Sequence, residues 1–168
     1  MKHISRQPAG RQGFTLVELM VYSVILVIFL YIMTTLASQL LEVQLESETT
    51  SAVTEDSRFI LNRFSYDIAR ASSVVQPAAF GAQTSTLVLR IGQATYTYAI
   101  QNGNLILTDP TETASLNSYG SNVSNLTFQR YGNVNGKPSV RLTFTLMSVA
   151  KRAGGAETHD YEATYGTR

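Results

Sequence analysis

An unbroken apolar segment near the amino terminus restricts what this chain of 168 residues can fold into. It runs from Phe14 to Leu36 and contains one charged side chain, Glu18. A helix that rises about 1.5 Å per residue would be about 35 Å long over this segment, enough to cross a hydrocarbon core of about 30 Å. The apolar core of a secretory signal is shorter, about 7 to 15 residues. The sequence therefore predicts one membrane-spanning helix.

The charges around this segment predict its orientation. Lys2, Arg6 and Arg11 precede it, no acidic residue stands among the first thirteen residues, and no basic residue follows it directly. Basic residues next to a span favour the cytoplasmic side. We therefore expect a single-pass membrane protein, with its amino terminus in the cytoplasm and its folded part outside. Cleavage after Ala37, which would release a secreted soluble product, remains an alternative.

Composition excludes several classes of site. The chain has no cysteine, which removes disulfides, thiol nucleophiles and cysteine-ligated metals. Its net charge is +1 and no stretch rich in Lys and Arg follows the leader, so nucleic acid is not an expected partner. His159 is the only histidine outside the leader and has no nucleophile motif to support a catalytic triad. A calcium site at the loop of Asp109 and Glu112 stays open. We predict no catalytic residue, cofactor or metal site, and no enzyme.

Glu18 needs a physical reason, because an ionised carboxylate inside a span costs a few kcal/mol unless it is paired or reaches water. One explanation is that it lies near the helix start, where it can reach the interface and the positive end of the helix dipole. The other begins with a cut between Gly13 and Phe14. The new α-amine of Phe14 would then be a cation at a matching depth, able to pair with Glu18 of the same chain or of a neighbouring one.

The residues around this cut form a motif. Residues 11–18 read Arg-Gln-Gly-Phe-Thr-Leu-Val-Glu, which resembles the processing signal of type IV prepilins and type II secretion pseudopilins. The resemblance implies that prepilin peptidase cleaves after Gly13 and methylates the amine of Phe14. It also implies that Glu18 guides the docking of subunits into a filament. The expected partners are this peptidase, an inner-membrane assembly platform, other pilin or pseudopilin subunits and membrane lipid.

The segment that follows is predicted to be an amphipathic helix, with neither Pro nor Gly from Ala37 to about Ser73. Its apolar residues recur at helical spacing and predict a buried stripe. The stripe consists of Val53, Ile60, Phe64, Ile68 and Ala71. The charged residues are expected on the remaining surface: Glu55, Asp56, Arg58, Arg63, Asp67 and Arg70. Weak helix formers at 46–52 predict a bend or local melting there, and unwinding on assembly would speed amide exchange at Ser47–Ser51.

Strand patterns replace helical periodicity before Gln76-Pro77. Gly92-Gln93 and Asn102-Gly103 are hairpin signals that predict a meander of three strands. A second pair of strands and an edge strand follow after polar loops. The expected strands are Thr86–Ile91, Ala94–Ile100, Leu105–Leu107, Val123–Tyr131, Ser139–Ser148 and His159–Thr167. One long helix followed by antiparallel strands predicts an α+β fold.

This layout also resembles pilins, in which a long amino-terminal helix packs on an antiparallel sheet. Residues 57–71, with the pattern Asp67-Ile68-x-x-Ala71, resemble the corresponding helix of minor pilins and J-type pseudopilins. The expected parts are a leader (1–13), a membrane and filament-core helix (14–36), an amphipathic helix (37–75) and a sheet head (76–168). We interpret the chain as a structural subunit, most similar to a minor one, of a type IV pilus or type II secretion pseudopilus. The alternative is a single-pass extracytoplasmic binding domain that never polymerises.

Overall fold

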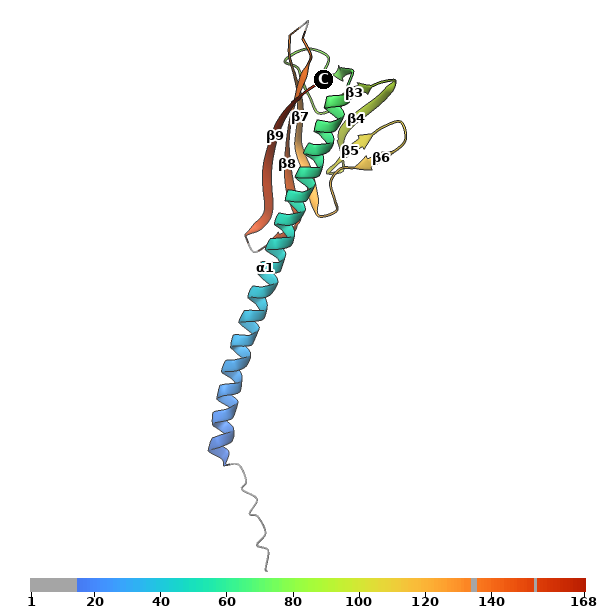
Figure 1. Ribbon diagram of the computed structural model, residues 1–168. Helices are drawn as coiled ribbons and strands as arrows, with labels where there is room; N and C mark the ends of the chain where they lie inside the picture. Colours follow the sequence, from blue (N-terminus) through green and yellow to red (C-terminus); the bar gives the residue numbers. More distant parts are fainter. Residues whose placement is uncertain (1–14, 134–135, 153) are drawn as a thin grey trace, which may run out of the picture. The chain divides into compact units, whose positions relative to one another are not determined.

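The chain has one long helix followed by nine strands in the part that the structure describes (Figure 1). This computed structural model describes residues 15–133, 136–152 and 154–168 and divides the chain into two compact units, Met1–Leu41 and Glu42–Arg168. The elements are α1 (Leu16–Arg70), β1 (Ser73–Gln76), β2 (Gln83–Thr84), β3 (Leu87–Ile91), β4 (Ala94–Gln101), β5 (Asn104–Thr108), β6 (Thr113–Ser115), β7 (Ser121–Tyr131), β8 (Ser139–Arg152) and β9 (Gly155–Gly166).

The described part of the first unit is the amino-terminal portion of α1. Its apolar side chains are exposed, and its most apolar stretch has a mean hydropathy of 2.5. Among the described residues, α1 is the one helix long and apolar enough to cross a membrane. An apolar surface of this kind needs lipid or other protein around it, because exposure to water is unfavourable.

In the second unit, which we call the head, the carboxyl-terminal part of α1 packs on antiparallel sheets. The predicted stripe is confirmed: Val53, Ile60, Phe64 and Ile68 are fully buried, and Ala71 is 3% exposed. One prediction for this segment is wrong, because Asp67, expected on the polar surface, is fully buried. The α+β fold predicted from the sequence is therefore confirmed, with one charged residue in its interior.

The local melting predicted as one possibility at residues 46–52 is absent, since α1 stays helical through this stretch. Thr49 belongs to this stretch and is only 1% exposed. Its hydroxyl donates a hydrogen bond to the Glu46 carbonyl at 2.9 Å. Packing of the Thr49 side chain thus outweighs the weak helix propensity of this stretch. The helix ends at Arg70, earlier than the predicted end, and β1 begins at Ser73.

The strands form two antiparallel sheets where the sequence analysis expected one. Sheet A has the order β1-β3-β4-β5-β6 and sheet B the order β2-β7-β8-β9. All six predicted strands are present, with β9 at the edge of sheet B as expected. The three strands that the sequence analysis missed, β1, β2 and β6, are short and lie at sheet edges.

Two-residue turns fix the register of sheet A. Gly92 and Gln93 join β3 to β4, and Asn102 and Gly103 join β4 to β5. Asn102 and Gly103 have φ angles of 52° and 80°, which is the left-handed pair that a type I′ hairpin turn requires. Both hairpins predicted from these residues are confirmed.

The core of the head lies between α1 and the two sheets. Phe64 of α1 meets Tyr98 of β4 edge to face at 6.1 Å, and its ring centre lies 6.1 Å from that of Phe128 of β7. Along β8 the buried residues alternate with more exposed ones, as in a strand with one face on the core: Val140, Leu142, Phe144 and Leu146. These contacts hold the second half of α1 to both sheets.

Candidate functional site

The start of α1 carries the residues that the sequence analysis singled out. Thr15 precedes the helix, and its hydroxyl accepts a hydrogen bond from the Glu18 amide at 3.2 Å. This is an N-cap, which satisfies one of the amide groups left free at a helix start. The spacing Thr15-x-x-Glu18 is also that of a capping box. The sequence analysis missed this local signal, which explains why the helix begins here.

Glu18 is half-buried, whereas the side chains on either side of it along the helix are exposed. The Tyr22 hydroxyl, one turn further on, donates a hydrogen bond to Glu18 Oε1 at 3.2 Å. A carboxylate can accept several hydrogen bonds, so this contact leaves capacity for a cation. The side chain therefore has a local polar partner inside an otherwise apolar helix and remains able to bind an amine.

Gly13 and Phe14 lie outside the described residues. Cleavage between them, methylation of Phe14 and the docking role of Glu18 therefore stay predictions.

The head contains a buried ionic cluster that the sequence analysis did not foresee. The fully buried carboxylate of Asp67 accepts hydrogen bonds from Arg63 Nε at 2.9 Å, Arg70 Nη2 at 3.0 Å and the Tyr98 hydroxyl at 2.6 Å. Burial of Tyr98, together with this hydrogen bond and the negative charge of Asp67, raises the pKa of the Tyr98 hydroxyl. The cluster ties α1 to β4. We assign it a structural role, because the two arginines compensate a carboxylate that packing forces inside.

A second carboxylate of α1 holds the loop before β7. Asp56 Oδ2 accepts hydrogen bonds from the Ser118 amide at 3.0 Å, the Ser118 hydroxyl at 2.8 Å and the Ser121 hydroxyl at 2.6 Å. A carboxylate that accepts several hydrogen bonds from one loop restricts that loop strongly. Asp56 thus fixes the loop between β6 and β7 against the helix.

The loop that the sequence analysis considered for calcium is organised by its own hydrogen bonds. Asp109 Oδ1 accepts from the Thr111 amide at 2.8 Å, the Thr111 hydroxyl at 2.6 Å and the Glu112 amide at 2.9 Å. These hydrogen bonds lower the pKa of Asp109. The described residues contain no group of three or more His, Cys, Asp or Glu side chains arranged for a metal ion. Asp109 serves here to close a turn.

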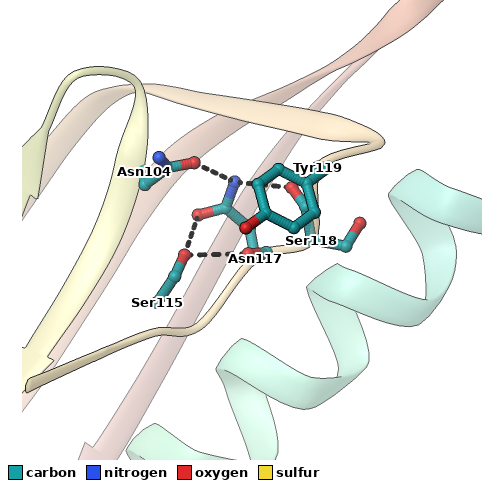
Figure 2. A pocket seen from close by; sticks show the side chains of 5 residues that line it. All are labelled: Asn104, Ser115, Asn117, Ser118 and Tyr119. Carbon is teal, nitrogen blue, oxygen red and sulfur yellow. Dashed lines mark hydrogen bonds between the residues drawn. The ribbon is translucent and has the colours of Figure 1, made fainter.

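A pocket of about 200 Å³ lies at the start of β5, beside the loop that joins β6 to β7 (Figure 2). Its lining consists of Asn104, Ser115, Asn117, Ser118 and Tyr119. The buried Asn117 amide donates to Asn104 Oδ1 and to the Ser121 carbonyl and accepts from the Leu105 amide. The pocket is smaller than typical ligand pockets of about 300 to 1,000 Å³. No carboxylate, imidazole or amine lines it, so its chemistry is limited to hydrogen bonding.

His159 lies exposed on β9, where its Nε2 is 2.6 Å from Glu157 Oε1. This contact joins two residues of one strand and brings in no serine nucleophile. His159 therefore lies on the surface of the head.

Comparison with known proteins places the family signal at the amino terminus. Residues 8–33 match the family model described as the prokaryotic N-terminal methylation motif. Neither curated proteins nor solved structures give a significant match. The match covers the positions of Gly13, Phe14 and Glu18 and supports a protein like a type IV pilin or pseudopilin. The family with this motif is structural rather than enzymatic.

Proposed function

We propose that this protein is a minor structural subunit of a type IV pilus or of a type II secretion pseudopilus. The observation that carries the proposal is a coincidence of position. The methylation motif at residues 8–33 overlaps the start of an exposed apolar helix long enough to cross a membrane. A methylation motif and a long apolar helix together fit a pilin or pseudopilin subunit.

In this proposal the apolar part of α1 has two successive environments. The precursor is stored in the inner membrane, with its basic leader in the cytoplasm and its head outside. Prepilin peptidase cuts after Gly13 and methylates Phe14, which removes the leader charges that hold the helix in place. With the assembly platform, the helix then leaves lipid for a bundle of related helices at little hydrophobic cost, since lipid tails are as apolar as the side chains.

Glu18 supplies the polar contact that this transfer needs. An unpaired carboxylate buried in a helix bundle costs several kcal/mol, and pairing with an amine offsets much of that cost. The amine of Phe14 in a neighbouring subunit is the cation that processing would create. The Tyr22 hydroxyl satisfies one acceptor site of Glu18 within its own chain and leaves capacity for that amine. Docking in the correct register is therefore favoured over docking that leaves Glu18 unpaired.

The assignment as a minor subunit rests on two weaker observations. The pattern Asp67-Ile68-x-x-Ala71 resembles that of minor pilins and J-type pseudopilins. The chain also has no cysteine, whereas major pilins often close a carboxy-terminal loop with a cysteine pair.

Substitution of Glu18 tests the docking role. We expect Glu18→Ala to be processed normally and to enter filaments at least about tenfold less often, because the partner amine is left unpaired. Tyr22→Phe is the matched control, since it removes the hydrogen bond to Glu18 and keeps the carboxylate. Gly13→Lys should leave the leader attached, which the precursor mass would show. Incorporation of Glu18→Ala at the wild-type level would refute the docking role.

A further inference from the structure

The four edges of the two sheets differ in length. Three of them are strands too short to pair extensively: β1 has 4 residues, β6 has 3 and β2 has 2. The fourth edge is β9, which has 12 residues and runs along the margin of sheet B beside β8 (Figure 1). Short edge strands protect a sheet against pairing with other chains. This protection is present at three edges and absent at β9.

The direction of the backbone groups in β9 follows from its pairing with β8. The Thr167 amide donates to the Pro138 carbonyl at 3.0 Å, and the register with β8 is unbroken from Gly166 back to Thr158. Because backbone groups alternate in direction along an antiparallel strand, the odd-numbered residues bond to β8. The amides and carbonyls of Asp160, Glu162 and Thr164 therefore point to the free edge. No strand of the described residues pairs with them.

The side chains of β9 give this edge two different faces. Tyr161 and Tyr165 pack against the core of the head, whereas Asp160, Glu162 and Thr164 are exposed on the outer face. The strand contains no Pro, Lys or Arg. On the outer face, Glu162 pairs with Arg141 of β8 at 3.3 Å, and Asp160 accepts a hydrogen bond from the Thr145 hydroxyl at 2.6 Å. An incoming strand would thus meet a partly apolar inner face and an outer face on which β9 presents two carboxylates, one of them shared with an arginine.

We propose that the free edge of β9 binds an extended segment of a different protein, which adds a strand to sheet B and carries Lys or Arg opposite Asp160 and Glu162. Main-chain hydrogen bonds would supply much of the affinity, and the paired charges would supply the selectivity. This interface is separate from the docking role of Glu18 and does not depend on it.

A second copy of this chain fits the edge poorly. Two two-fold arrangements overlap the two β9 strands most fully: Asp160 of one copy faces Glu162 of the other in the first, and the two copies of Asp160 face each other in the second. Like charges directly opposite each other destabilise a strand pair. Charge complementarity therefore favours a basic partner over self-association.

Synthetic peptides of about eight residues can probe the edge on the processed full chain in detergent micelles. One peptide alternates Lys with Val, and its control alternates Glu with Val. We expect the lysine peptide to slow amide exchange at Asp160 and Glu162 at least about tenfold and to bind about tenfold more tightly than the glutamate peptide. No slowing at these two amides at millimolar lysine peptide would overturn the proposal, as would equal binding of the two peptides.

Thr164→Pro provides the matched backbone test. Proline is tolerated on an edge strand where its amide position faces outward, yet it removes a donor that an added strand needs. We expect this variant to unfold cooperatively and to lose protection by the lysine peptide, while Thr164→Ala keeps it. Protection of Thr164→Pro at the wild-type level would contradict the proposal. If this variant does not fold, Asp160→Lys/Glu162→Lys replaces it: reversed peptide preference supports the proposal, and unchanged preference overturns it.

Discussion

Replacing Tyr98 by Phe removes one hydroxyl from the interior of the head and keeps its aromatic packing. The ring of Tyr98 meets Phe64 at 6.1 Å and Phe128 at 6.4 Å, and a phenyl ring can keep both contacts. The hydroxyl donates to Asp67 Oδ2 at 2.6 Å, and the Tyr98 side chain is 1% exposed. The substitution therefore isolates the hydrogen bond that joins α1 to β4 through a buried carboxylate.

The expected loss follows from the remaining partners of Asp67. Its carboxylate keeps Arg63 at 2.9 Å and Arg70 at 3.0 Å and loses one charge-assisted hydrogen bond. A hydrogen bond of this kind contributes about 1.5 to 3 kcal/mol to the free energy of unfolding. We expect Tyr98→Phe to lower the stability of the head by that amount.

Urea unfolding of the full chain in detergent, followed by the near-ultraviolet circular dichroism of its tyrosines, measures this loss. The chain has no Trp, so the signal comes from Tyr and Phe. Tyr119→Phe is the matched control, because Tyr119 is fully exposed and its hydroxyl should contribute less than about 0.5 kcal/mol. Equal stability of the two variants would refute the role that we assign to the buried cluster.

Three further predictions follow from the head and the helix. Asp56→Ala should lower the free energy of unfolding by about 1 to 3 kcal/mol and speed amide exchange in the loop 117–121, because three hydrogen bonds are lost; unchanged exchange there would contradict this. Burial, and then the contact with Asp67, raises the pKa of the Tyr98 hydroxyl in the folded head. The stability that this hydroxyl contributes is therefore fully present below about pH 10, and above that pH the free energy of unfolding falls by about 1.4 kcal/mol per pH unit. The free energy of unfolding, measured by urea titration at several pH values above about 10, should therefore fall more steeply with pH for the wild type than for Tyr98→Phe. Equal slopes would argue against the raised pKa. Finally, amide exchange at Ser47–Ser51 should be faster in assembled filaments than on either side of this stretch, whereas uniform protection would exclude unwinding.

The elements that the sequence predicts are those with a long regular pattern. The stripe from Val53 to Ala71 repeats at helical spacing, and the strands of both sheets alternate or flank clear turn signals. A pattern sustained over many residues survives local exceptions. β1, β2 and β6 are missed because strands of 2 to 4 residues are too short to show any period.

The division of the strands between two sheets depends on pairings that sequence patterns do not contain. β2 pairs with β7, although β3 to β6 lie between them in the chain. The burial of Asp67 was missed for a different reason. Residue 67 follows Ile60 at heptad spacing and belongs to the buried stripe by geometry, but a carboxylate was assigned to the surface by its type. Its partner Tyr98 lies 31 residues away, and no local pattern links the two.

The amino-terminal site was predicted from residue type and spacing, because its signal lies within eight consecutive residues. The structure adds the Thr15 cap and the hydrogen bond from Tyr22 to Glu18, and both involve neighbours within one helical turn. The edge of β9 was predicted as a strand, but its exposure as the one long free edge emerges only from the order of all described strands.

The most direct test of the central claim is the intact mass and amino-terminal peptide of the protein taken from its native membrane. We predict a chain that begins at N-methylated Phe14, since that product requires cleavage after Gly13 by prepilin peptidase. A chain that begins at Met1 would contradict the account and favour a membrane-anchored domain that does not polymerise. A chain that begins near Ser38 would contradict it in another way, by indicating a secreted product.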